Sequence, residues 1–227
     1  MMTHEEDTAV RAVSPPSVYH HRSILGTSLD ASEEVLFSPR QIRLQRGGEG
    51  GMQGMAEISS IELGLIGCIK SCLDATARKL QANGIMGNKD WTHDCLNALV
   101  KLGRKIGYGV CPEPEIMKGE WLYDLIWYTE EESEWPNRVT DVVLAIESEW
   151  SQKLSDIRYD FQKLVQAKSR LKMLISNKLS PDDLKRLKYD IECFQRKDES
   201  EIYIFAMWVG GDIPFAYETY RSGCINN

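Results

Sequence analysis

The chain has 227 residues, a formal charge of −7 and 42% hydrophobic residues. This length and composition are enough for one folded domain with a sizeable core. No apolar run approaches the roughly 20 residues that cross a bilayer, and no apolar signal segment stands near the N-terminus. We therefore expect a cytoplasmic protein that does not span a membrane. The six Cys and four His also lack the spacing of a zinc or redox motif, which argues against those site classes.

Residues 1–54 differ in composition from the rest of the chain. They contain SPPS and the glycine-rich run GGEGGMQG, and they show no sustained apolar periodicity. We expect 1–54 to be a disordered extension with a Gly-rich linker and 55–227 to form the folded domain. Because the extension offers little apolar surface to bury, its removal should cost little stability.

Two helices are expected at the start of the folded domain. Apolar residues recur every three to four positions from Ile58 to Leu80, which predicts a long amphipathic helix. A second helix is predicted from about Asp90 to Arg104, followed by a short strand in GYGVCPEPE.

Strands and helices then alternate. Aromatic and β-branched runs predict strands at 120–128 and 141–149. The remaining elements are a helix over 152–168, a strand in RLKMLIS, a helix over 181–195 led by the capping sequence SPDD, and a strand over 201–209. The order α-α-β-β-β-α-β-α-β indicates an α/β fold, with a mixed sheet flanked by helices.

Charge is distributed unevenly along the domain. Residues 113–149 carry eleven acids and two bases, whereas residues 151–197 carry twelve bases and six acids. An acidic centre beside a basic surface suits a metal-dependent enzyme that acts on phosphodiesters. A solvated helix surface would give the same pattern, so this alternative stays open.

Three carboxylates stand near the ends of two predicted strands. Side chains alternate along a strand, so Glu147 and Glu149 are expected on one face with Val143 and Ala145. Asp124 interrupts the apolar run of the preceding strand, where an unpaired carboxylate would be costly to bury. If the two strands are adjacent and in register, the three carboxylates converge on a site for Mg²⁺ or Mn²⁺. Solvent-exposed acids at a sheet edge are the alternative.

The sequence resembles the PD-(D/E)XK nuclease superfamily, whose restriction-endonuclease-like core has the order α-β-β-β-α-β. The resemblance is carried by Asp124 in YDLIW, by Glu147 and Glu149 in AIESEW, and by the later runs DFQKL and RLKMLI. It covers about residues 90–210. It implies that Asp124, Glu147 and Glu149 are catalytic metal ligands for Mg²⁺ or Mn²⁺.

The sequence departs from the superfamily pattern at the lysine position. Glu149 stands where Lys is usual, and no Pro precedes Asp124. In some members the lysine has moved to the following helix, which here offers Lys163 and Lys168. The resemblance to DFQKL selects Lys163 as the catalytic lysine, whereas the angular position of the apolar stripe on the predicted helix selects Lys168.

The implied activity is metal-dependent hydrolysis of phosphodiester bonds, with DNA expected ahead of RNA as the nucleic-acid partner. A homodimer or a larger defence or repair complex is the assembly that this activity suggests. The main alternative is a catalytically inactive scaffold of the same fold that binds a protein or nucleic-acid partner. An unrelated acidic α/β protein is a third reading of the same sequence.

Overall fold

A computed structural model of the chain describes residues 58–85, 87–112, 122–133, 137–195, 198 and 200–222. The predicted extension, 1–54, lies outside these residues. The helices of the described part are α1 (Ser60–Ala82), α2 (Asn88–Lys105), α3 (Leu154–Gln166) and α4 (Pro181–Cys193).

Side chains at the N-termini explain where two of these helices begin. The hydroxyl of Ser59 accepts the N–H of Glu62, while the Glu62 side chain accepts the N–H of Ser59, a reciprocal capping box that starts α1. Ser180 caps α4 in the predicted way, with Pro181 in the first turn.

The sheet follows chain order. It consists of β1 (Gly109–Cys111), β2 (Leu125–Glu131), β3 (Arg138–Glu149), β4 (Ser169–Asn177), β5 (Ile202–Trp208) and β6 (Phe215–Arg221). The pairs β1–β2, β2–β3 and β5–β6 are antiparallel, whereas β3–β4 and β4–β5 are parallel. Helix α3 connects the first parallel pair and α4 connects the second, so the expected α/β fold with a mixed sheet is confirmed.

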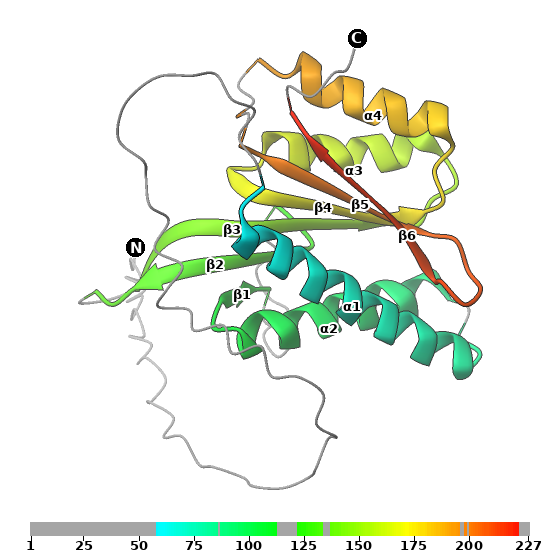
Figure 1. Cartoon of the computed structure of the whole chain (residues 1–227), viewed down its shortest axis with the longest axis horizontal. Helices are drawn as coiled ribbons and strands as arrows, with labels where there is room; N and C mark the ends of the chain where they lie inside the picture. Colours follow the sequence, from blue (N-terminus) through cyan, green and yellow to red (C-terminus); the bar gives the residue numbers. More distant parts are fainter. Residues whose placement is uncertain are drawn as a thin grey trace, which may run out of the picture. The chain divides into compact units, whose positions relative to one another are not determined.

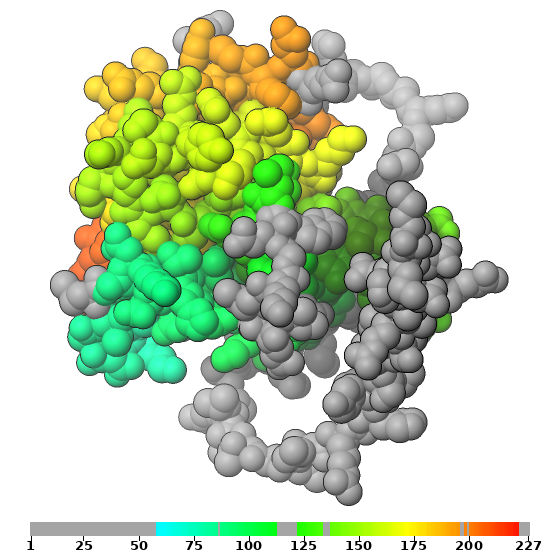
Figure 2. All heavy atoms as spheres, turned by 180° about the vertical axis from the view of Figure 1, so that it is seen from behind, coloured from blue at the N-terminus to red at the C-terminus, as the bar shows by residue number. Residues whose placement is uncertain are grey.

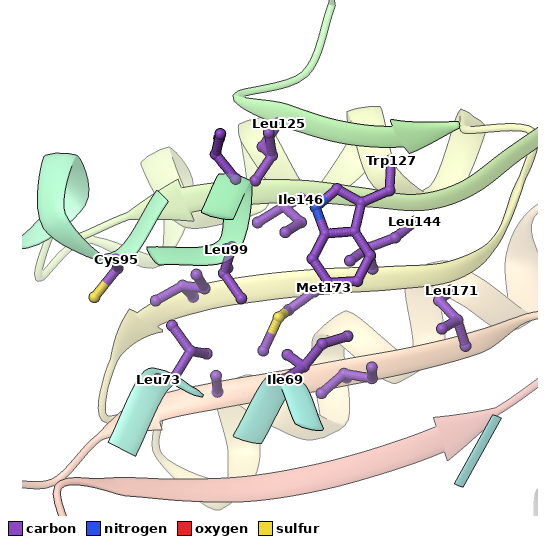
Figure 3. Packing of buried hydrophobic residues seen from close by; sticks show 14 of the residues in the cluster. Ile69, Leu73, Cys95, Leu99, Leu125, Trp127, Leu144, Ile146, Leu171 and Met173 are labelled. Atoms are coloured by element: carbon purple, nitrogen blue, oxygen red, sulfur yellow. The ribbon is translucent and has the colours of Figure 1, made fainter. Parts of the chain in front are cut away.

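Helices cover both faces of this sheet (Figure 1). On one face, α1 and α2 pack on alternate strand residues; Figure 3 shows this packing, with Ile69, Leu73, Cys95, Leu99, Leu125, Trp127, Leu144, Ile146, Leu171 and Met173 labelled. On the other face, the core includes Ile126, Ala145, Ile157, Phe161, Leu164, Leu174, Leu187, Ile191, Tyr203 and Phe205, which come from the sheet, α3 and α4. A side chain on this second face therefore points toward α3 and α4.

A β-bulge changes the predicted facing of one residue. Trp127 pairs with Leu144, but the next residue, Tyr128, pairs with Val142, so Val143 is an extra residue in β3. Val143 packs toward α1 and α2, whereas Ala145 lies on the α3 and α4 face. The expectation that both share a face was wrong because strict alternation breaks at this bulge.

One strand and two element boundaries also differ from the prediction. The strand β2 begins at Leu125 rather than at residue 120, so Asp124 directly precedes this strand instead of interrupting it. The strand β6 was not predicted, since its sequence FAYETYR mixes polar and aromatic residues without a clean alternation. Helix α3 ends at Gln166 because Ala167 has an extended backbone, with φ −63° and ψ 138°. Lys168 therefore lies after the helix, and its predicted helical angle does not apply.

Within the described ranges, no helix is long and apolar enough to cross a membrane.

Two helical glycines test the packing on the α1 and α2 face. A Cβ at Gly103 would lie 2.7 Å from the Nε1 atom of Trp127, a fully buried side chain, whereas a Cβ at Gly67 meets nothing within 4 Å. We expect Gly103→Ala to destabilise the protein by about 1–3 kcal/mol through overpacking. The matched control Gly67→Ala should stabilise it by up to about 1 kcal/mol, since alanine favours helix. Urea unfolding measures both, and equal effects would contradict the packing described.

Candidate functional site

Strand pairing brings Asp124 and Glu147 together. Leu125 at the start of β2 pairs with Ile146 of β3, so the antiparallel register places Asp124 opposite Glu147. An Oδ2 oxygen of Asp124 accepts the backbone N–H of Ser148 at 2.8 Å, which fixes this carboxylate against β3. The expected adjacency of the two strands is confirmed.

Glu147 is a buried carboxylate, and one of its oxygens has no hydrogen-bond partner among the described residues. Its side chain is 1% exposed, and it pairs across β3–β4 with Leu174 on the face covered by α3 and α4. In the described part of the chain, its Oε1 atom has no hydrogen-bond partner. The pKa of Glu147 is raised to about 8, first by burial and then by the negative charge of Asp124, against the lowering effect of Lys163. The site therefore disfavours a second negative charge unless a cation compensates it.

Lys163 supplies a positive charge to this site from α3. Its Nζ atom lies 3.2 Å from Oε2 of Glu147 and 2.6 Å from Oδ1 of Asp160, one helical turn earlier. Partial burial lowers the pKa of Lys163, but the hydrogen bond with Asp160 and the charge of Glu147 outweigh this effect and raise it. Lys163 is therefore a protonated ammonium that joins Asp160 to Glu147.

The other two residues predicted for the site have different surroundings. Glu149 stands at the end of β3, where its Oε1 atom accepts the N–H of Ser151 at 2.6 Å. Lys168 is exposed in the connection between α3 and β4. Across the ranges that the structure describes, no group of three His, Cys, Asp or Glu side chains is arranged to hold a metal ion. The expected convergence of three carboxylates is thus reduced to two, Asp124 and Glu147.

The pair of carboxylates still suits a hard divalent cation. Mg²⁺ and Mn²⁺ prefer oxygen ligands, and Mg²⁺ commonly takes one or two protein carboxylates and completes its shell with water and phosphate oxygens. The Oε1 atom of Glu147, which has no hydrogen-bond partner in the part of the chain that the structure describes, is an acceptor available for such an ion. The residues present therefore fit Mg²⁺ or Mn²⁺ better than they fit Zn²⁺, which favours Cys and His.

Two features beside the site were not predicted. Tyr123 packs on the face covered by α3 and α4, where burial and then the charge of Glu147 raise the pKa of its hydroxyl. Lys172 of β4 is fully buried and forms a 2.7 Å ion pair with Glu201 and a 3.2 Å hydrogen bond with Tyr203. A single cation inside the apolar run LKMLI was the available signal for Lys172.

Basic residues line the outer surface on the same side of the sheet. A groove of about 350 Å³ runs between α3 and α4 and is lined by Arg158, Asp182, Lys185, Arg186, Tyr189 and Asp190. Arg158 forms two hydrogen bonds of 2.7 Å with Asp190, so part of this charge is neutralised locally. Figure 2 shows the yellow-green side chains of α3 gathered on the surface of this region. Three of the bases of residues 151–197 therefore lie in this groove, together with two acids.

Comparison of the chain with protein-family models, with curated proteins and with solved structures finds no match in any of the three. A functional assignment therefore rests on the residues of the chain itself.

The burial of Glu147 predicts a specific dependence of stability on pH. The native carboxyl has a pKa near 8, compared with an ordinary value of 4.5, so the native state binds more protons between these values. In metal-free buffer, this group should make the free energy of unfolding fall as pH rises from about 4.5 to about 8. We expect Glu147→Gln to remove this fall and to be more stable than the parent above about pH 8.

Urea unfolding across this pH range measures the effect. Glu130→Gln, at an exposed position of β2, is the control for loss of one acid and should keep the slope of the parent. A Glu147→Gln protein with an unchanged pH slope would show that Glu147 is not held in a disfavoured ionised form.

Proposed function

We propose that the protein is a metal-dependent hydrolase of phosphodiester bonds in nucleic acid, with DNA ahead of RNA as its substrate. The observation that carries this proposal is the buried carboxylate of Glu147, with an unpartnered Oε1 in the described part, beside Asp124 and within 3.2 Å of Lys163. Buried acids of this kind, with a perturbed pKa and a specific charged neighbour, cluster at functional sites.

The order of the elements supports the proposal. The run α2, β1, β2, β3, α3, β4 has the order α-β-β-β-α-β of the restriction-endonuclease-like core. In this run Asp124 directly precedes the second strand and Glu147 lies near the end of the third. Lys163 comes from the helix after the third strand, which is where some members of the superfamily that the sequence resembles carry this lysine.

The proposed roles follow from the charges of the side chains. Asp124 and Glu147 would hold Mg²⁺ or Mn²⁺, with water and phosphate oxygens as further ligands. When bound, the ion would lower the pKa of a water molecule and offset the negative charge of the phosphate. Lys163 is protonated, so it would attract the phosphate and orient water as a hydrogen-bond donor rather than act as a base. Glu149 is left out of this set because, among the described residues, no group of three His, Cys, Asp or Glu side chains is arranged to hold a metal ion.

A catalytically inactive scaffold of the same fold is the second candidate. It is favoured by the ion pairs of Lys163, which already neutralise part of the charge of Glu147 and Asp160 without a metal ion. In such a protein the acidic and basic surfaces would bind a protein or nucleic-acid partner, and Glu147 would serve a structural role.

Melting temperatures with and without Mn²⁺ separate the two candidates. An ion that binds the native state alone must raise apparent stability, by about 2.7 kcal/mol at a hundredfold excess over the dissociation constant. We expect Mn²⁺ to stabilise the parent but neither Asp124→Asn nor Glu147→Gln. Without metal and above about pH 8, where Glu147 is ionised, both variants should be at least as stable as the parent, since each then removes a repelling charge and keeps the shape of the side chain.

Glu130→Gln is the matched control for this experiment, and its Mn²⁺ response should equal that of the parent. Cleavage of labelled DNA and RNA oligonucleotides, with a chelator as the blank, then tests the activity. No Mn²⁺ response in the parent, combined with loss of stability in Asp124→Asn and Glu147→Gln, would reject the hydrolase and favour the scaffold.

A further inference from the structure

Lys163 occupies a position between two carboxylates of different surroundings. Its Nζ atom lies 3.2 Å from Oε2 of Glu147, which is buried, and 2.6 Å from Oδ1 of Asp160, which belongs to the partly exposed flank of α3. Among the described residues, the oxygen of Glu147 without a hydrogen-bond partner is Oε1, whereas Lys163 contacts Oε2. The ammonium of Lys163 and a metal ion would thus bind to the same carboxylate, that of Glu147.

We propose that Lys163 is an internal counter-ion that competes with the divalent cation for Glu147 and thereby sets the affinity of the site for metal. This inference rests on the proposed function, because it concerns the metal affinity of the same two carboxylates. It adds a regulatory role for the lysine that is separate from its role toward the phosphate.

Electrostatics gives the sign of this competition. A fixed ammonium repels a divalent ion at Glu147 about twice as strongly as it repels a proton there. Loss of the ammonium therefore favours the metal ion whether the carboxyl starts ionised or protonated. The repulsion is weakly screened, since the side chain of Glu147 is 1% exposed.

Two residues of α3, Asp160 and Tyr159, can still hold the ammonium of Lys163 when a metal ion binds to Glu147. Asp160 holds the ammonium from the helix itself, and the ring centroid of the exposed Tyr159 lies 5.9 Å from Nζ. The side chain of Lys163 is 26% exposed, so it can turn toward solvent and keep these two partners. Withdrawal from Glu147 therefore does not leave the ammonium without a counter-ion.

The test is a titration of the intact chain with Mn²⁺ alone, read as the dissociation constant from calorimetry or thermal shift. Lys163→Met removes the ammonium, and we expect it to tighten Mn²⁺ binding by about tenfold or more, even where hydrolysis falls. Lys168→Met is the matched control, because it removes an equal charge from an exposed position outside α3 and should bind like the parent. If Lys163→Met does not fold, Lys163→Gln keeps a donor for Asp160 and should give the same tightening.

Each outcome of the Mn²⁺ titration supports or overturns the proposed competition. Tighter binding in the Lys163 variants and not in Lys168→Met supports the competition, including the case in which the parent binds too weakly to measure. Equal or weaker binding in the Lys163 variants, with parent binding that depends on Asp124, overturns the competition and leaves the proposed function intact. Absence of Asp124-dependent binding in the parent and in the Lys163 variants overturns the proposed function itself.

Discussion

The burial of one carboxylate, that of Glu147, is the constraint on which this account depends. A carboxylate that is 1% exposed, next to Asp124, is unfavourable when ionised unless positive charge stands nearby. Lys163 provides one such charge from α3. The geometry leaves the second oxygen of Glu147 without a partner in the described residues, which is the feature that a purely structural ion pair does not require.

The architecture explains why this carboxylate is buried at all. The antiparallel pair β2–β3 sets Asp124 opposite Glu147, and the parallel pair β3–β4 sends the chain through α3, which covers the same face. The lysine and the two acids therefore come from consecutive elements of one β-β-α-β run. The core on the other face, under α1 and α2, holds the strands in place without contributing a charge to the site.

Sequence patterns were sufficient for the order of the elements from α1 to β5, for the flanking helices and for the adjacency of the strands that bring Asp124 to Glu147. They did not reveal where local backbone geometry departs from a regular repeat. The bulge at Val143 reverses one predicted face, and the extended backbone of Ala167 ends α3 before Lys168. The angular argument for Lys168 failed for that reason. Lys163 reaches Glu147 from α3, with Nζ 3.2 Å from Oε2, and a long flexible side chain can carry a charged head of this kind past apolar neighbours. The strand β6 was missed because its polar residues find partners in the folded protein, as Tyr220 does with Glu192.

The central claim is that Asp124 and Glu147 together hold a divalent cation. Anomalous X-ray scattering from crystals soaked in Mn²⁺, collected at the manganese edge, tests it most directly. The account predicts an anomalous peak within coordination distance of a carboxylate oxygen from each residue, about 2.0–2.2 Å for small divalent ions of this class. A fully soaked crystal with no peak between these two side chains, or with Mn²⁺ bound only at other acids, would contradict it.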